Sequence, residues 1–264
     1  LEDEAMRARG QAVLEDMSPE TVAGWGVEVL ILALPNGLAA PHADLADRSG
    51  LESVVVDLSA DYRFDPSWVY GLPERARARI HGARRIANPG CYATGIQLGI
   101  GPALPLLAGP PTVFGVSGYS GAGTTPSPRN DPARLHGNLL AYSLTGHLHE
   151  REASHQLGHA LHFIPHVASW FRGISLTISL PLARPSTAAE LLARYRDSYA
   201  DEPLVHVHAG IPEVQAIAGR HDVQIGGFAV DGHHAVLVVT LDNLLKGAAS
   251  QALQNINLAL GLPE

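Results

Sequence analysis

Two short apolar runs near the start of the chain constrain its fold more than any other feature. Residues 27–34 form the first run, which ends in the turn sequence Pro35-Asn36-Gly37, and residues 53–58 form the second. Apolar runs of this length that end at turn residues are typical of buried parallel strands. The alanine- and leucine-rich residues 38–48 between them predict a crossover helix. The sequence therefore predicts a βαβ unit of a nucleotide-binding fold, with ligand-facing turns at the carboxyl ends of its strands.

The segment before this unit lacks the expected opening of a dinucleotide-binding fold. Such a fold normally begins with a strand, a glycine-rich turn and a helix that receives the pyrophosphate. Residues 1–26 do not contain this pattern: residues 1–10 predict a polar helix or connector, and Ser18-Pro19 is typical of a helix start. We therefore expect an incomplete Rossmann-like domain, either truncated at its N-terminus or completed by a partner.

The remainder of the chain predicts more strands than helices. Strands are expected at residues 111–117, 174–182, 204–208, 223–230 and 235–241, and helices at residues 187–200 and 243–260. Many strands with few helices are typical of a mixed, largely antiparallel sheet. The expected fold class is thus α/β plus α+β.

Composition excludes several classes of function. The formal charge of −8 over 264 residues disfavours nucleic acid, which requires a basic surface. No apolar stretch approaches the roughly 20 residues of a membrane span, and the acidic first residues differ from a secretory signal. A single cysteine excludes an intrachain disulfide framework and agrees with a reducing compartment. We expect a cytoplasmic protein that binds neither nucleic acid nor membranes.

Cys91, the only cysteine, follows Asn88-Pro89-Gly90, where a turn leads into a predicted helix at residues 91–101. Unpaired backbone amides at a helix start favour negative charge and lower the pKa of a thiol. The position therefore predicts a nucleophilic thiolate with a pKa below about 7.5. The alternative is that Cys91 is one more small, buried apolar residue.

Several motifs along nearly the whole chain resemble those of one enzyme family. They are, besides the cysteine segment, residues 33–37 (ALPNG), 56–63 (VDLSADYR), 70–74 (YGLPE), 117–123 (SGYSGAG), 146–149 (GHLH), 163–166 (FIPH) with Arg172-Gly173, 242–249 (DNLLKGAA) and 254–257 (QNIN). By their number and order, the chain resembles the N-acetyl-gamma-glutamyl-phosphate reductases of arginine biosynthesis, relatives of aspartate-semialdehyde dehydrogenase.

The resemblance implies a division into domains and a reaction. Residues 1–90 and 243–264 would form the dinucleotide-binding domain, because the last helix returns to it in this family, and residues 91–242 would form the catalytic and oligomerisation domain. Cys91 would displace phosphate from N-acetyl-gamma-glutamyl phosphate, and hydride from NADP(H) would convert the resulting thioester to the semialdehyde. A homo-oligomer is also expected from the family.

The resemblance also implies roles for individual side chains. His147 and His149 match the family's histidine pair; in an extended segment both would face one cleft, and we favour His149 as the acid/base with His147 as its support, although spacing does not separate them. Arg63 would bind the substrate phosphate and Arg172 its carboxylate, since guanidinium groups bind both anions. Asn88 would orient the substrate or brace the turn.

Cofactor contacts are expected at the turn after the first strand and at the glycine-rich loop. They are Pro35, Asn36, Gly37, Ser59, Ser120, Gly121, Gly123 and Asn243.

Three histidines, His155, His159 and His162, would share one face if their segment were helical, a spacing that could bind zinc. The segment supplies neither a fourth ligand nor the glutamate of a metalloprotease motif, so no metal is expected. Two other functions stay open: an acyl-phosphate reductase for an aminoadipyl or aspartyl phosphate, and a non-catalytic subunit without a complete nucleotide site. The arginines at residues 75–85 could dock a carrier-bound substrate, but a solvated charged loop explains them better.

Overall fold

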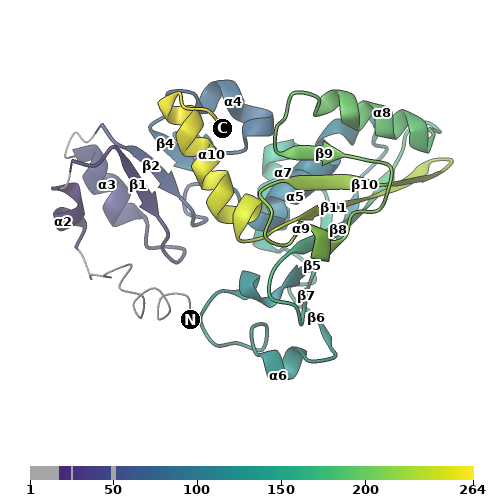
Figure 1. Ribbon diagram of the computed structural model, residues 1–264, viewed down its shortest axis with the longest axis horizontal. Helices are drawn as coiled ribbons and strands as arrows, with labels where there is room; N and C mark the ends of the chain where they lie inside the picture. The colour runs from purple at the N-terminus through teal and green to yellow at the C-terminus, as the bar shows by residue number, and fades with distance from the viewer. Residues whose placement is uncertain (1–17, 25, 49–51) are drawn as a thin grey trace.

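The computed structural model describes residues 18–24, 26–48 and 52–264. The expected helix or connector at residues 1–10 lies outside these residues. The chain forms two sheets that lie side by side, the smaller one containing the N-terminal strands (Figure 1). In the described part of the chain, no helix is long and apolar enough to cross a membrane.

The smaller sheet contains the predicted βαβ unit. Strands β1 (Val29–Leu32) and β2 (Val54–Asp57) pair in parallel, and α3 (Ala40–Arg48) connects them. All four residues of β2 are buried, as expected for a strand covered on both faces. The sheet continues to β4 (Arg85–Ala87) and β3 (Val69–Tyr70), again in parallel. The parallel-sheet prediction is therefore confirmed.

Helices complete this part of the molecule. The short α2 (Pro19–Ala23) begins as predicted, because the Ser18 side chain accepts a hydrogen bond from the Thr21 backbone N–H. The C-terminal α10 (Ser250–Leu260) lies beside the smaller sheet (Figure 1). Its Ala252 and Ile256 pack in one cluster with the apolar side chains of β2 and β4. The arginine-rich segment forms a helix, α4 (Pro73–Ile80), so its expected assignment as a loop was wrong.

The larger sheet has seven strands in the order β6-β7-β5-β8-β11-β10-β9. Their bounds are β5 (Thr112–Gly118), β6 (Leu139–Ala141), β7 (His162–Ala168), β8 (Ile174–Pro181), β9 (Val205–Val207), β10 (Val223–Asp231) and β11 (His234–Leu241). Among the described residues, β5·β7 and β9·β10 are parallel and the other four pairings are antiparallel. The sheet is mixed and largely antiparallel, as the sequence predicts.

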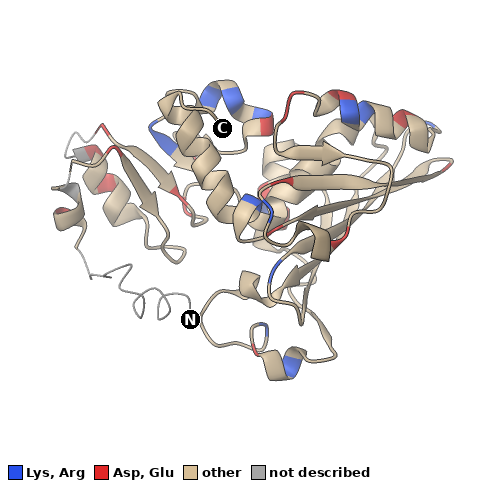
Figure 2. Ribbon diagram, viewed as in Figure 1, with Lys and Arg blue, Asp and Glu red and all other residues tan. Residues whose placement is uncertain are grey.

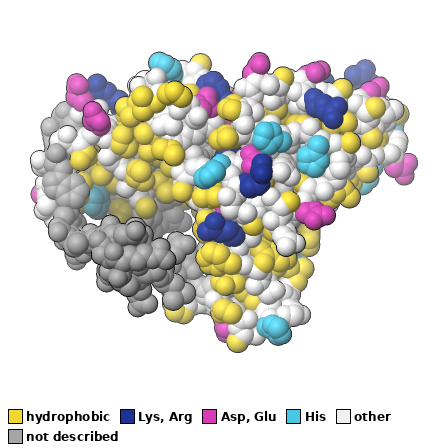
Figure 3. Space-filling view, in the orientation of Figure 1, with side chains coloured by type: hydrophobic (Ala, Val, Ile, Leu, Met, Phe, Trp, Pro, Cys, Tyr) yellow, Lys and Arg dark blue, Asp and Glu magenta, His cyan; other side chains and the backbone are white. Residues whose placement is uncertain are grey.

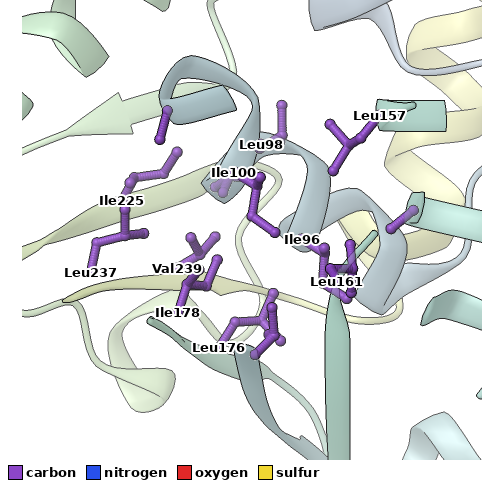
Figure 4. Packing of buried hydrophobic residues seen from close by; sticks show 14 of the residues in the cluster. Ile96, Leu98, Ile100, Leu157, Leu161, Leu176, Ile178, Ile225, Leu237 and Val239 are labelled. Atoms are coloured by element: carbon purple, nitrogen blue, oxygen red, sulfur yellow. The ribbon is translucent and has the colours of Figure 1, made fainter. Parts of the chain in front are cut away.

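The main core lies between this sheet and α5 (Cys91–Ile100), the helix that begins with the cysteine. Ile96 and Ile100 of α5 lie above Leu176, Ile178 and Val239 of the sheet (Figure 4). Each such side chain, once buried, contributes roughly 1.5–3 kcal/mol. Two glycines of α5 face the strands, and a Cβ at the second of them would lie 2.8 Å from Val239 Cγ2. The close packing fixes the helix, and with it the position of its first residue.

Several other helices surround the larger sheet. They are 3-10 helix η1 (Gly101–Leu106), 3-10 helix η2 (Tyr119–Ala122), α6 (Pro132–Leu135), α7 (Leu148–Leu157), α8 (Ala188–Ser198) and α9 (Val214–Ile217). Thr187 and Glu190 form a capping box at the start of α8, which lies within the helix predicted at residues 187–200. The predicted helix at residues 243–260 is interrupted by a π-helical segment, η3 (Leu245–Ala249), which precedes α10.

The histidine-rich region differs from its prediction. Helix α7 ends at Leu157, where Gly158 adopts a left-handed φ of 63°, and His162 already belongs to β7. His155, His159 and His162 therefore do not share a helical face. The described residues also contain no group of three or more His, Cys, Asp or Glu side chains that could hold a metal ion.

Charged side chains are distributed unevenly over the molecule. Arginines recur on α4 and α8, each of which also carries at least one carboxylate, and most of the strands carry neither charge (Figure 2). On the face shown in Figure 3, apolar side chains gather over α10 and over the lower part of the view, where Figure 1 places α6, β6 and β7.

Candidate active site

Cys91 is the first residue of α5 and lies at one wall of a small pocket of about 70 Å³. Strand β4 ends just before it, so the parallel sheet positions the cysteine where the two sheets meet. The other lining residues are Tyr92, Ser117, Gly118, Gly121, Ala122, Tyr142, His147, His149 and Val167. The structure thus brings together the three side chains that the sequence assigns to catalysis.

Gly90 allows the histidine to approach the cysteine. A Cβ at this position would overlap the imidazole of His149, at Nε2 and Cδ2, and would lie 2.7 Å from Arg63 Nη1. Only glycine leaves room for both groups against the turn that precedes Cys91. The Nε2 edge of His149 therefore lies beside that turn, within the same pocket as the thiol.

His147 and His149 stand at the start of a helix, so the predicted extended segment was wrong. His147 is the N-cap of α7, and its Nδ1 accepts a hydrogen bond from the His149 backbone N–H at 3.1 Å. The two rings lie 5.0 Å apart, and both contact the ring of Tyr92. The cap brings both imidazoles to one pocket, although for a different reason from the alternation of a strand.

Burial keeps the His149 side chain neutral. Desolvation, followed by the positive charge of Arg63, holds the pKa of His149 well below its usual value. His149 Nδ1 has no hydrogen-bond partner within the described part of the chain. A neutral imidazole is a base, so His149 is suited to accept a proton.

The prediction of a thiol with a low pKa was wrong for Cys91. Burial raises the pKa of Cys91 to about 11, although the Tyr92 backbone N–H and the Arg63 charge both oppose the rise. Helix-start amides are present, as predicted, but desolvation outweighs them. The resting pair is therefore a neutral thiol beside a neutral imidazole, and a thiolate forms only when the proton has an acceptor.

Arg63 does not lie in the pocket as a free phosphate ligand. It is only 7% exposed, and each of its three nitrogens donates to a protein acceptor: Nε to Asn88 O, Nη1 to Glu152 Oε2 and Nη2 to Leu58 O. Three of its five N–H groups are thereby used within the protein, and the phosphate contact expected from the sequence stays a prediction. Arg63 lies behind the cysteine turn and holds it in place.

Glu152, which the sequence analysis did not select, is central to the same support. This fully buried carboxylate accepts hydrogen bonds from Arg63, from Tyr70 Oη at 2.7 Å and from the Gly90 backbone N–H at 2.9 Å. Gln97 of α5 donates in turn to Tyr70 Oη. The only feature of the sequence that points to Glu152 is its position three residues after His149. The groups that donate to its carboxylate are distant from it in the sequence.

Asn88 braces the turn, one of the two roles expected for it. It is 1% exposed, its Nδ2 donates to Ala248 O at 3.3 Å, and its Oδ1 accepts from Asn255 Nδ2 at 3.1 Å. The π-helical segment presses on the other side of the site, since a Cβ at Gly247 would lie 2.7 Å from Cys91 Cβ. π-Helical turns occur frequently at functional sites.

Arg172 lies next to the pocket but is not among its lining residues. Its backbone N would lie 2.7 Å from a Cβ at Gly118, which does line the pocket. Its side chain is 29% exposed and forms a long ion pair of 3.6 Å with the buried Asp242. A long, partly exposed ion pair can exchange for a substrate carboxylate.

The expected cofactor residues of the smaller sheet lie at the carboxyl ends of β1 and β2. Gly37 has a φ of 88°, and its N–H donates to Asp61 Oδ1 at 2.6 Å. Asn36 Oδ1 accepts from the Ala60 N–H. These bonds join the two turns where an α/β sheet binds nucleotides, and Pro35, Asn36 and Gly37 are left exposed.

Ser59 is less accessible than predicted. It is 3% exposed, and its hydroxyl donates to Asp57 Oδ2 and accepts from the Asp61 N–H. Its role is to hold the turn after β2, so the structure does not support a direct cofactor contact.

The remaining expected cofactor residues surround the glycine-rich turn at η2. Ser120 and Gly123 line a cavity of about 810 Å³ together with Tyr119, Phe171 and Leu244, whereas Gly121 faces the cysteine pocket. Asn243 donates to Ser120 Oγ and accepts from the Gly173 N–H. It is 3% exposed and therefore positions the turn.

These residues fit a nicotinamide cofactor. A cavity of this volume is typical of a small-molecule site, and it combines aromatic and aliphatic walls with the Ser120 hydroxyl. Gly121 and Ala122 bring only small side chains to the cysteine pocket, so a flat ring can approach the reacting carbon.

The chain matches family models of the semialdehyde dehydrogenases, a class of oxidoreductases with an NAD binding domain. The family model described as semialdehyde dehydrogenase, NAD binding domain, matches residues 2–83, and that described as semialdehyde dehydrogenase, dimerisation domain, matches residues 91–243. The fold is similar to that of aspartate semialdehyde dehydrogenase II from Vibrio cholerae, with a TM-score of 0.74 at 19% identity, covering 90% of this chain and 81% of that one. The enzyme from Francisella tularensis gives 0.75 at 16% identity, covering 95% and 86%.

Comparison with individual relatives identifies the family within this class of oxidoreductases. N-acetyl-gamma-glutamyl-phosphate reductase from Stenotrophomonas maltophilia is 55% identical, covering 100% of this chain and 84% of that protein. The Xanthomonas oryzae reductase is 57% identical, covering 95% and 80%. Protein arg11, mitochondrial, of Schizosaccharomyces pombe is 55% identical over 90% of this chain and 27% of its own length. The chain belongs to the N-acetyl-gamma-glutamyl-phosphate reductase family, which confirms the resemblance drawn from its motifs.

Proposed function

We propose that the protein reduces N-acetyl-gamma-glutamyl phosphate to N-acetylglutamate 5-semialdehyde in arginine biosynthesis, through a thioester on Cys91. The observation that carries this proposal is the meeting of Cys91, His147 and His149 in one pocket beside a wall of small residues. Family membership supports the choice of substrate. A bound nicotinamide cofactor would supply the hydride that converts the thioester to the aldehyde.

In the first stage, His149 accepts the proton of the Cys91 thiol as sulfur attacks the acyl carbon. The carbon–sulfur bond forms, the carbon–oxygen bond to phosphate breaks, and the proton passes from His149 to the departing phosphate. The neutral resting pair supports this order, because His149 can take a proton that Cys91 does not lose by itself. The Cys91 backbone N–H at the start of α5 is suited to face the oxyanion.

In the second stage, His149 again carries one proton. After hydride addition, the tetrahedral carbon bears an oxyanion and the sulfur, and collapse to the aldehyde breaks the carbon–sulfur bond. His149, neutral since it gave its proton to phosphate, takes up a proton from solvent and passes it to the leaving thiolate. His147 supports this exchange, because its Nδ1 holds the His149 backbone in the first turn of α7. We therefore assign the acid/base role to His149 and a positioning role to His147.

We propose NADP(H) as the cofactor, on the basis of the family resemblance. Residues 1–90 with 243–264 would bind it, and residues 91–242 would carry catalysis and oligomerisation. The packing of α10 against β2 supports this division, as do the ranges of the two matching family models. Steady-state kinetics with NADPH and NADH test the cofactor: kcat/KM should be higher with NADPH, and equal values would refute the choice.

We also propose a cytoplasmic homo-oligomer formed through the larger sheet. Phe114 of β5 points away from the α5 side and is 39% exposed, although it packs against His166 of the neighbouring strand. Phe114→Glu should lower the mass measured by light scattering, because an apolar contact is replaced by a charge. An unchanged mass would place the contact elsewhere.

A coupled spectrophotometric assay tests the proposed activity. N-acetylglutamate kinase generates the acyl phosphate in situ. Consumption of NADPH is followed with the kinase in excess, so that the protein under test limits the rate. Activity with this substrate, and little with aspartyl or aminoadipyl phosphate, would support the proposal. Activity only with another acyl phosphate would change the substrate, and inactivity with all three would favour the non-catalytic subunit.

A further inference from the structure

The proposed substrate carries two anionic groups, and the arginine expected to bind one of them already uses most of its hydrogen-bond donors within the protein. Arg63 donates from all three of its nitrogens to protein acceptors behind the cysteine turn. Arg172 adjoins Gly118 on one wall of the pocket. A substrate with two anionic groups would be bound more firmly by a further cation at a different wall of the pocket.

Arg129 occupies such a position. Its Cζ lies 4.9 Å from the centroid of the Tyr142 ring, and Tyr142 lines the pocket together with Cys91 and both histidines. The ring of Tyr142 lies 5.6 Å from that of His147 in an edge-to-face contact, so the three side chains follow one another along one wall. Within the described residues, Arg129 forms no ion pair with a carboxylate.

The loop that carries Arg129 is held in place by its own hydrogen bonds. Asn130 donates to Gly123 O and to Thr125 O, both at 2.8 Å, and accepts from the Ser127 N–H at 2.7 Å. The next residue, Asp131, caps α6. Because these bonds already order the loop, little conformational entropy is lost when the half-buried guanidinium binds a ligand.

The electrostatics of the pocket agree with this position. After burial, the charge of Arg129 is the main influence that lowers the pKa of His147. The same charge opposes the burial that raises the pKa of Tyr142 to about 12. The guanidinium is therefore close enough to act on groups that line the cysteine pocket.

We propose that Arg129, supported by the Tyr142 ring, is a specificity-determining residue that binds an anionic group of the substrate, either its phosphate or its carboxylate. The inference rests on the proposed function for the identity of that substrate, but the positive charge at the pocket can be tested without it. A planar guanidinium over an aromatic ring retains its donors for such an oxyanion.

Alkylation of the single cysteine tests the charge directly. Iodoacetate and iodoacetamide deliver the same carbon to Cys91, and only iodoacetate is anionic. The ratio of their rates at low ionic strength should fall about tenfold in Arg129→Gln, because the attraction of the guanidinium is lost. Arg129→Lys should retain most of the ratio, and Arg134→Gln, an exposed arginine of α6, is the matched control. Equal ratios in the wild type and in Arg129→Gln would overturn the proposal.

Kinetics in the aldehyde-oxidising direction then identify the group. If Arg129 binds the phosphate, Arg129→Gln should raise the KM for inorganic phosphate about tenfold; if it binds the carboxylate, the KM for the semialdehyde should rise instead. The KM for the cofactor should not change in either case. A lower alkylation ratio with both KM values unchanged would also overturn the proposal. If the wild type does not use this substrate, the proposed function fails, while the alkylation ratio still decides whether an anion site exists.

Discussion

Replacement of Glu152 by glutamine should weaken the fold and, at the same time, increase the reactivity of Cys91. Glu152 and Arg63 form a buried ion pair at 2.9 Å, with exposed fractions of 0% and 7%. Loss of one partner of such a pair costs about 3–5 kcal/mol, because the other charge remains buried without compensation. Glutamine keeps the shape and one acceptor oxygen for the Gly90 N–H, so we expect a loss near the lower limit, about 3 kcal/mol.

The effect on Cys91 has a defined sign. The charge of Glu152 raises the pKa of the thiol and that of Arg63 lowers it. Glu152→Gln leaves the arginine unopposed, so the thiol pKa should fall below its present value of about 11. More thiolate is then present at pH 8, and alkylation by iodoacetamide should become several times faster.

Urea unfolding and the pH profile of alkylation measure the two effects in the same protein. Glu213→Gln, at an exposed position of similar chemistry, is the control. A loss of stability below about 1 kcal/mol would show that the pair is not the support proposed here. A thiol pKa that is unchanged or raised in Glu152→Gln would refute the electrostatic argument.

The remaining predictions concern the residues around Cys91. In the wild type, alkylation should accelerate about tenfold per pH unit from pH 7 to pH 10, since the thiol pKa is about 11; a plateau near pH 8 would contradict this. Gly90→Ala should lower turnover by at least about a hundredfold, because its Cβ would displace His149 and Arg63, whereas Gly109→Ala, where a Cβ meets nothing within 4 Å, should not. His149→Asn should lower turnover by roughly a hundredfold or more, with no change in metal content and no effect of chelators. Near-normal turnover of His149→Asn would move the acid/base role to His147.

Much of the fold followed from local patterns. The run at residues 27–34 and its partner at 53–58 predict β1 and β2 because a buried parallel strand is apolar along its length. The structure buries all four residues of β2, whereas β1 is only partly buried. The elements that were missed lack such a pattern. Strand β7 contains Pro165 between histidines, and proline argues against a strand inside a sheet. Helix α4 is rich in arginine and has few apolar residues to show a helical period.

The site could be predicted only where local sequence determines it. Cys91 was placed at its helix start from the preceding Pro89-Gly90, but the sign of its pKa shift depends on burial, which the sequence does not show. Glu152 and Arg63 are 89 residues apart, so their pairing depends on how the two sheets pack. Arg129 was missed for a related reason: its partner Tyr142 and the pocket behind it are assembled from separate loops.

The thioester on Cys91 is the central claim, and mass spectrometry of the intact protein tests it most directly. Aldehyde oxidation with the oxidised cofactor, in the absence of phosphate, should stop after the acyl group has been transferred to sulfur. The account predicts one N-acetylglutamyl group per chain, located on Cys91, absent from Cys91→Ala and released when phosphate is added. A wild-type protein that forms the reduced cofactor at a steady rate without phosphate and shows no adduct, or a Cys91→Ala variant that carries the adduct, would contradict it.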